Sequence, residues 1–311
     1  MPSRLAITLC GVPLKNPVLA ASGSYAYGVE LKGIVDLADL GGIVVKGLSR
    51  EPMQGNPPPR LIETASGMIN SVGLQNLGVR AFVRDKLPEL AGCGTAIFAN
   101  VFGYSVDDYV EVLRVLEDAP GVDGYELNVS CPNTKHGGIF FSSDAALLAE
   151  VVGAARAAIH SQRPMIVKLS PNVTDIAAMA RIADEAGADA ISLVNTFVAL
   201  AIDARTREAS IGAGFGGLSG PAIQPIALRM VHEVYRAVKL PIVGLGGIST
   251  GLDAASFLIA GATAVAVGTA NFWDPQSPVR IARELDEFLQ QEKIERASHL
   301  TGTLKFKGKN A

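Results

Sequence analysis

The fold is decided by the stretch Pro241-Ile242-Val243-Gly244-Leu245-Gly246-Gly247-Ile248-Ser249, which leads into an apolar segment at residues 250–259 and a second β-branched run at 264–268. Both β-branched runs have the length and composition of buried strands, and the segment between them has the composition of a helix. Strand, helix and strand in this order predict a βαβ unit of a parallel sheet.

The same alternation recurs along the chain. We expect eight strands, at residues 17–20, 42–46, 96–100, 124–129, 165–169, 190–195, 241–245 and 264–268. Helical patterns lie between them, at residues 106–117, 144–160, 175–186, 222–238 and 250–259. Eight strands alternating with helices predict an α/β fold in which a parallel sheet closes into a (β/α)8 TIM barrel. An open doubly wound sheet competes, but the Gly-x-Gly-x-x-Gly fingerprint of dinucleotide-binding sheets is absent after the first strand.

The segments outside this repeat complete the expected architecture. Residues 5–9 and 11–14 indicate an N-terminal hairpin that would cap the barrel bottom. Two insertions, 49–74 and 196–220, interrupt the alternation, and loops of such length in a compact domain are usually functional or disordered. We expect a single domain over residues 1–311, with its barrel core at about 17–293.

Composition excludes several classes of protein. With 49% hydrophobic and 18% charged residues, the chain is typical of a soluble globular protein with a large core. A net charge of −3 offers no basic surface for nucleic acid. Cys10, Cys93 and Cys131 have neither disulfide-framework nor metal-ligand spacing, so we expect no metal and a reducing cytoplasm. No signal peptide or apolar run of membrane-spanning length is present, so we expect no membrane association.

Polar residues close five of the expected strands. They are Lys46, Asn100, Asn128, Lys168 and the pair Asn195-Thr196. In a TIM barrel the carboxyl ends of all strands meet at the face that carries the active site, so these side chains should meet there. A single lysine at a strand end usually reaches out to solvent, but two lysines and three asparagines at matching positions indicate a binding site.

Glycines follow the last two strands, at Gly246-Gly247 and at Gly268 before Thr269, and Gly220 precedes Pro221 at another helix start. Exposed backbone N–H groups in the loops after strands seven and eight frequently bind phosphate in this fold, although a Gly-Gly pair also suits a tight turn. We therefore expect a phosphorylated cofactor. Amides can pair with an imide edge and lysine with a carboxylate, so Asn70, Asn128, Asn133 and Asn195 suggest a pyrimidine-like substrate.

Cys131 lies in the loop Asn128-Val129-Ser130-Cys131-Pro132-Asn133-Thr134-Lys135-His136-Gly137-Gly138, directly after an expected strand. A thiol among amides, with Lys135 and His136 nearby, can act as an acid or base next to a polar planar ligand. A structural cysteine in a tight turn is the alternative.

The chain resembles the dihydroorotate dehydrogenases, and class 1B most. The resemblance rests on motifs between about residues 20 and 269, namely Ala21-Ser22-Gly23, Val45-Lys46-Gly47, Asn56-Pro57-Pro58-Pro59-Arg60, Gly67-Met68-Ile69-Asn70-Ser71-Val72-Gly73-Leu74-Gln75-Asn76, the Cys131 loop, Val167-Lys168-Leu169, Asn195-Thr196, Gly217-Leu218-Ser219-Gly220 and Gly246-Gly247-Ile248. Val194 is one of the conservative differences. The combination of the Cys-Pro-Asn element with the loop at residues 70–76 is highly specific.

The resemblance implies FMN-dependent oxidation of dihydroorotate to orotate, in pyrimidine biosynthesis. Cys131 would be the base that removes the substrate C5 proton while a hydride passes to FMN. It implies a substrate site made of Lys46, Asn70, Ser71, Val72, Gly73, Leu74, Asn128, Asn133, Asn195 and Thr196. It implies an FMN site made of Ser22, Lys46, Gly47, Asn100, Asn128, Lys168, Val194, Gly220, Gly246, Gly247, Gly268 and Thr269.

Class 1B resemblance also implies a partner subunit that carries FAD and a [2Fe–2S] cluster and passes electrons to NAD, in a heterotetramer built on a homodimer of the catalytic chain. This chain has no dinucleotide fingerprint and too few grouped cysteines for such a cluster. The alternatives are a fumarate-linked class 1A enzyme, another flavin barrel such as a dihydropyrimidine dehydrogenase-like or tRNA dihydrouridine synthase-like reductase, and a non-catalytic flavin subunit that relays electrons.

Overall fold

The computed structural model describes residues 3–130, 132–133 and 139–307. Eight parallel strands form a closed barrel in the order β11-β12-β17-β18-β3-β4-β7-β8. Their bounds are β3 Val18–Ala20, β4 Gly42–Val44, β7 Ala96–Val101, β8 Gly124–Asn128, β11 Met165–Lys168, β12 Ala190–Leu193, β17 Ile242–Leu245 and β18 Ala264–Val267. The predicted (β/α)8 barrel is therefore confirmed.

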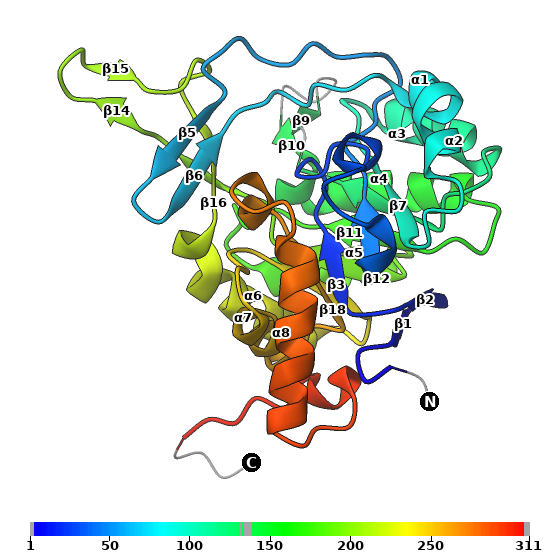
Figure 1. Cartoon of the computed structure of the whole chain (residues 1–311). Helices are drawn as coiled ribbons and strands as arrows, with labels where there is room; N and C mark the ends of the chain where they lie inside the picture. The colour runs from blue at the N-terminus through cyan, green and yellow to red at the C-terminus, as the bar shows by residue number, and fades with distance from the viewer. Residues whose placement is uncertain (1–2, 131, 134–138, 308–311) are drawn as a thin grey trace.

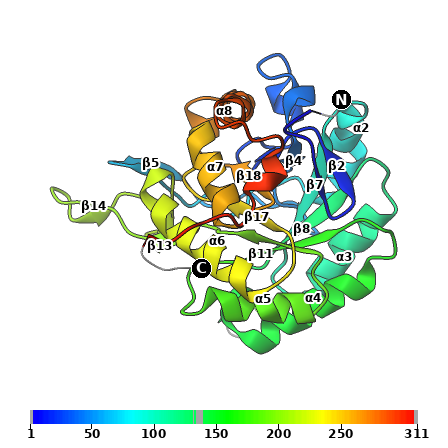
Figure 2. The same cartoon turned by 90° about the horizontal axis from the view of Figure 1, so that it is seen from below.

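Helices surround the barrel, as the view from below in Figure 2 shows. They are α1 Val79–Ala81, α2 Leu87–Leu90, α3 Val106–Glu117, α4 Ala145–Ala158, α5 Ile176–Glu185, α6 Gln224–Ala237, α7 Gly251–Ala260 and α8 Ser277–Gln291. Local sequence explains where they begin. The Ser105 side chain accepts a hydrogen bond from the backbone N–H of Asp108, and the Asp108 carboxylate accepts one from the backbone N–H of Ser105. This reciprocal pair is a capping box at the start of α3. None of the helices in the described ranges is both long and apolar enough to cross a membrane.

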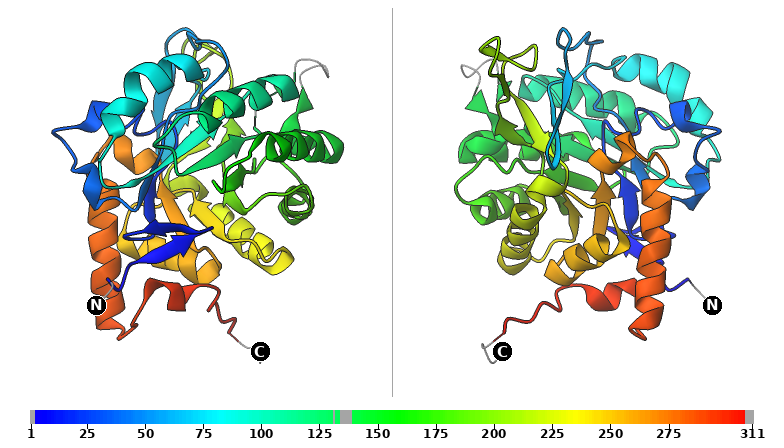
Figure 3. Two further views of the ribbon diagram at one scale, coloured as in Figure 1. Left: turned by 90° about the vertical axis from the view of Figure 1, so that its right-hand side faces the viewer. Right: turned by 60° about the vertical axis from the view of Figure 1, so that its left-hand side comes forward.

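The N-terminal hairpin closes one end of the barrel. Strands β1 (Ile7–Leu9) and β2 (Val12–Leu14) pair antiparallel, with Leu9 opposite Val12. Leu9 and Leu14 are buried in one cluster with Ala96, Ala190 and Ala264, which are the first residues of β7, β12 and β18. The hairpin therefore plugs the amino-terminal end of the barrel, as predicted, and it lies far from the sheet at the opposite end (Figures 1 and 3).

The two insertions, for which the sequence predicts loops without regular structure, form an antiparallel sheet at the other end of the barrel. Its strand order is β13-β16-β6-β5, with β5 Leu61–Thr64, β6 Gly67–Asn70, β13 Phe197–Ala199 and β16 Gly216–Ser219. A two-stranded arm, β14 Ile202–Asp203 and β15 Glu208–Ala209, extends beyond it (Figure 1). A further short pair, β9 Pro132–Asn133 and β10 Ile139–Phe140, belongs to the loop after β8.

Candidate active site

A cavity of about 800 Å³ opens at the carboxyl ends of the barrel strands. Its walls come from the residues that follow β3, β4, β7, β8, β11, β12, β17 and β18, and from the β13-β16-β6-β5 sheet. The side chains of Asn100, Asn128 and Lys168, at the ends of β7, β8 and β11, line this cavity. The cavity therefore occupies the position where TIM barrels carry their active sites.

The structure brings the predicted site residues together around this cavity. Its lining includes Ser22, Lys46, Gly47, Asn70, Ser71, Val72, Gly73, Leu74, Asn100, Asn128, Lys168, Val194, Asn195, Thr196, Gly220, Gly246, Gly247, Gly268 and Thr269. Cys131 lies outside the described residues. Asn133 belongs to β9, but its side chain is outside what the structure describes.

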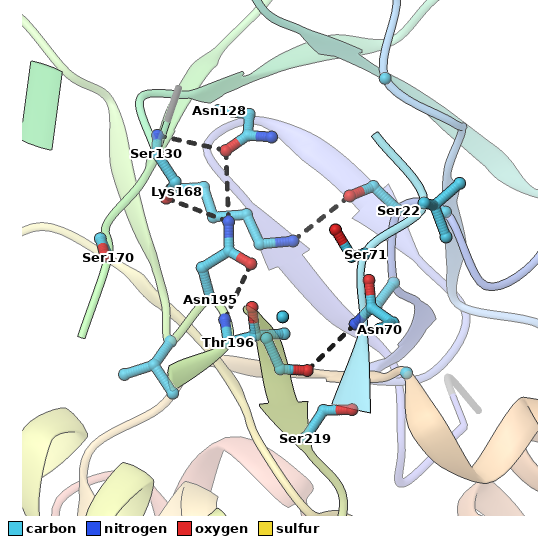
Figure 4. A pocket seen from close by; sticks show the side chains of 18 of the residues that line it. Ser22, Asn70, Ser71, Asn128, Ser130, Lys168, Ser170, Asn195, Thr196 and Ser219 are labelled. Carbon is cyan, nitrogen blue, oxygen red and sulfur yellow. Dashed lines mark hydrogen bonds between the residues drawn. The ribbon is translucent and has the colours of Figure 1, made fainter. Parts of the chain in front are cut away.

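Amide side chains are held in fixed orientations on one wall of the cavity (Figure 4). The Nδ2 group of Asn195 donates to Asn128 Oδ1 at 3.2 Å and to Ser130 Oγ at 3.0 Å. The Asn195 Oδ1 atom accepts from the backbone N–H of Thr196 at 2.8 Å. These contacts occupy the side-chain oxygen of Asn128. Its Nδ2 group donates to no residue that the structure describes, so it remains able to donate to a ligand in the cavity.

Lys168 reaches the cavity floor from the end of β11 and is only 5% exposed. Its Nζ atom donates to Ser22 Oγ at 3.3 Å and lies 3.5 Å from Oε1 of Glu126. The Glu126 carboxylate is 3% exposed and also accepts hydrogen bonds from Asn100 and Ser192. A buried ammonium group next to a buried carboxylate is thus built into the base of the cavity.

Lys46 extends into the cavity from the end of β4 and is half-buried. Burial lowers the pKa of its amine, and the positive charge of Arg60 lowers it further. Its Nζ atom forms no hydrogen bond or ion pair with the residues that the structure describes, in contrast to Lys168. A partly desolvated cation with no acidic partner in the described part of the chain is suited to bind an anionic group of a ligand.

Side chains that sequence reasoning missed hold the loop at residues 70–74. The Nδ2 group of Asn56 donates to Ser71 Oγ at 2.8 Å, and Arg60 donates to the Asn56 carbonyl oxygen. The Nδ2 group of Asn70 donates to the carbonyl oxygen of Gly217, at 3.3 Å, which joins this loop to β16. The loop at residues 70–74, which contains five predicted binding residues, is therefore held by hydrogen bonds within its own insertion and to the second insertion.

The sequence of the chain matches the dihydroorotate dehydrogenase family over residues 4–289. The chain belongs to this family. A protein of Solibacter usitatus with the provisional name dihydroorotate dehydrogenase A (fumarate) is 68% identical over 98% of this chain and 100% of its own length. The catalytic subunits named dihydroorotate dehydrogenase B (NAD(+)) of Thermodesulfovibrio yellowstonii and Geobacter sulfurreducens are 50% and 49% identical, over 97% and 96% of this chain and 99% and 98% of their own lengths.

Two residues at or below the cavity of this dihydroorotate dehydrogenase family member escaped the sequence analysis, although the sequence contains a signal for them. Glu126 is a lone charge in an apolar strand, two residues before Asn128, and a spacing of two places both side chains on the same face. Ser170 follows Lys168 by the same spacing and also lines the cavity. The Asn56 contact to Ser71 had no comparable signal, because it depends on how a long loop folds back.

Proposed function

We propose that this protein is a dihydroorotate dehydrogenase that uses FMN to oxidise (S)-dihydroorotate to orotate in de novo pyrimidine biosynthesis. The observation that carries the proposal is the composition of one cavity. It combines two lysines, six asparagines and the glycine-containing loops after β17 and β18, at the carboxyl end of a family barrel. The relatives in the family carry the same activity in their names, which supports the assignment.

The glycine loops fit a phosphorylated flavin. No hydrogen bond within the described part of the chain uses the N–H groups of Gly246 or Gly247, whereas the next N–H groups, from Ser249 on, are taken by Asp253 and Glu284. A Cβ at Gly268 would meet only Ala21 Cβ, at 3.7 Å, so a side chain there would enter the cavity rather than clash with protein. The free amides and this open space are what a bound phosphate needs.

Other glycines of the loops have a packing role as well. A Cβ at Gly247 would lie 2.8 Å from Gln224 Cβ, and one at Gly246 would lie 2.7 Å from Ala227 Cβ; both partners belong to α6. Close approach of α6 therefore requires glycine at both positions, whether or not phosphate binds. We propose that Ser22, Gly47, Asn100, Lys168, Val194, Gly220, Gly246, Gly247, Gly268 and Thr269 hold FMN, together with Lys46 and Asn128, in one domain.

Bound FMN would supply a flavin ring able to accept a hydride from the substrate. The residues of the chain would position the substrate and move its proton. Lys46 would pair with the orotate carboxylate, and the amides of Asn128 and Asn195 would bind the imide edge. Asn70–Leu74, Asn133 and Thr196 would complete the substrate site. Cys131 would accept the C5 proton as a thiolate base.

The test is anaerobic titration of the FMN-loaded protein with dihydroorotate. Loss of the absorption band of oxidised flavin measures its reduction. Bleaching within seconds is expected for the wild type. Replacement of Cys131 by alanine should slow flavin reduction by about 100-fold or more at neutral pH, while FMN stays bound, because no phosphate contact is removed. A wild-type flavin that dihydroorotate leaves oxidised would contradict the proposed activity. An alanine variant that is as fast as the wild type would contradict only the role of Cys131.

We further propose that the electrons leave through a partner subunit with FAD and a [2Fe–2S] cluster toward NAD. The relatives named as catalytic subunits of NAD(+) enzymes support this route. A second candidate is direct transfer to fumarate, which the provisional name of the 68% identical relative favours.

A further inference from the structure

Glu126 is a buried carboxylate to which neither the family motifs nor the proposed substrate contacts assign a role. It lies in β8, inside the barrel, and is 3% exposed. Its Oε1 atom accepts a hydrogen bond from Asn100 Nδ2 at 2.7 Å and lies 3.5 Å from Lys168 Nζ. Its Oε2 atom accepts from Ser192 Oγ at 2.9 Å.

These contacts join four neighbouring strands below the cavity. Asn100 belongs to β7, Lys168 to β11 and Ser192 to β12, and Glu126 lies between them on β8. A carboxylate removed from water is retained only when its charge is paired and its oxygens accept hydrogen bonds, and both conditions are met here. Asn100 and Lys168 also line the cavity, whereas Glu126 does not. Glu126 can therefore influence a ligand in two ways, through contact with these two side chains or through space by its own charge.

We propose that Glu126 is a positioning residue that holds the Lys168 ammonium group against the cavity, and that it tunes the bound flavin through Lys168. The inference rests on the proposed function, because it requires FMN in this cavity. Among the residues that the structure describes, the other partner of Lys168 Nζ is Ser22, whose Oγ atom accepts a hydrogen bond at 3.3 Å. A neutral hydroxyl cannot by itself balance the desolvation of a lysine that is 5% exposed. Without Glu126, burial of the Lys168 ammonium group at this position would be unfavourable, and we expect the side chain to move toward solvent.

The proposal can be tested by the sign of a change in the flavin reduction potential. A nearby cation stabilises the reduced, more negative flavin and raises the potential. If Glu126 acted only through its own charge, Glu126→Gln would remove a negative charge and raise the potential. If Glu126 acts by holding Lys168, the same substitution lets the ammonium group withdraw and lowers the potential. We expect the potential to fall.

A double-mutant cycle separates this role from a merely structural one. In the full-length FMN-loaded protein, Glu126→Gln should slow flavin reduction by dihydroorotate by about 10-fold or more, while the dissociation constant of orotate changes by less than about 2-fold. In a Lys168→Met background, Glu126→Gln should have a much smaller effect on the rate and should not lower the potential. Ser192→Ala is the matched control, because it removes a hydrogen bond from the other oxygen of the same carboxylate and leaves the Lys168 contact in place.

A potential that is unchanged or higher in folded Glu126→Gln, or an effect of equal size with and without Lys168, overturns the inference. If Glu126→Gln does not fold, Glu126→Asp is the substitute, because its side chain is one methylene shorter and draws the carboxylate away from Lys168. We expect the same fall in potential and the same slower flavin reduction. Failure of the proposed function has a different signature. In that case the wild-type protein itself would retain no FMN, or dihydroorotate would not reduce it.

Discussion

At the scale of single residues, the role that we propose for Lys46 is to pair with the carboxylate of the substrate. Its ammonium form is required for an ion pair, and burial with the nearby Arg60 lowers its pKa. Orotate affinity should therefore decline with rising pH earlier than an ordinary lysine would allow. Lys46→Ala should weaken orotate binding by about 10-fold or more at neutral pH and remove this decline. Lys46→Arg should not restore affinity, because a planar fork has a different geometry.

Orotate binding is measured by the perturbation of the flavin spectrum between pH 6 and 10. Lys239→Ala is the control, since Lys239 is an exposed lysine outside the cavity. Its orotate affinity should match the wild type at each pH. An affinity of Lys46→Ala equal to that of the wild type would remove this lysine from the substrate site.

The positions of single residues were predictable where they follow from lying at the carboxyl end of a barrel strand. Lys46, Asn128 and Lys168 close strands, and the carboxyl ends of parallel strands must meet at one face, so the sequence placed them correctly. The contacts between side chains were not predictable in the same way. The Lys168–Glu126 pair depends on the order and register of β8 and β11, in which Lys168 lies beside Asn128.

At the scale of elements, Glu117 at the end of α3 anchors the strand that supplies Glu126 and Asn128. Its carboxylate accepts from the Tyr125 hydroxyl in β8 at 2.6 Å and from the N–H groups of His160 and Ser161 at 2.8 Å each. Burial acts to raise the pKa of Glu117, but these hydrogen bonds outweigh it and lower the pKa to about 2. A lowered folded-state pKa contributes stability above the unfolded-state value, and this stability is lost as the pH falls.

Glu117→Gln should therefore lower the free energy of unfolding by about 1–3 kcal/mol at pH 7. The difference from the wild type should shrink as the pH falls from 4.5 to about 2. Urea denaturation across this range measures it. Glu233→Gln is the matched control, because Glu233 makes an exposed pair with Arg229 on α6 and such pairs contribute little. A difference that persists undiminished at pH 2 would show that the charge of Glu117 is not the cause.

The elements of the barrel were more predictable than the sheet above it. Barrel strands and helices repeat a strong local pattern, and their predicted positions agree with the structure to within a few residues. Strands β6 and β16 gave no such pattern. They contain Gly67, Gly216 and Gly217, and they pair only because segments far apart in the sequence meet, with Asn70 opposite Gly217. Non-local pairing of short, glycine-rich strands leaves no periodic signal in either segment.

At the scale of the whole molecule, the hairpin closes one barrel end and the cavity lies at the other. Under the proposed function, electrons delivered to FMN in this cavity would have to pass to an acceptor outside the chain. The names of the relatives divide between fumarate and NAD, although both groups match nearly the whole chain. Sequence similarity over the whole chain therefore does not distinguish fumarate from NAD as the electron acceptor, and an assay must decide between them. The chain itself has three scattered cysteines, fewer than the four grouped ligands that an iron–sulfur cluster normally needs.

We therefore expect the purified chain, loaded with FMN alone, to reduce an artificial dye with dihydroorotate and to show negligible reduction of NAD or fumarate. Addition of a subunit that carries FAD and a [2Fe–2S] cluster should restore NAD reduction, because it supplies the missing electron path. The dye reaction is the internal control, since it shows that the flavin is reduced at a normal rate. Rapid fumarate reduction by the isolated chain would contradict the need for a partner and would establish the direct route that the name of its 68% identical relative implies.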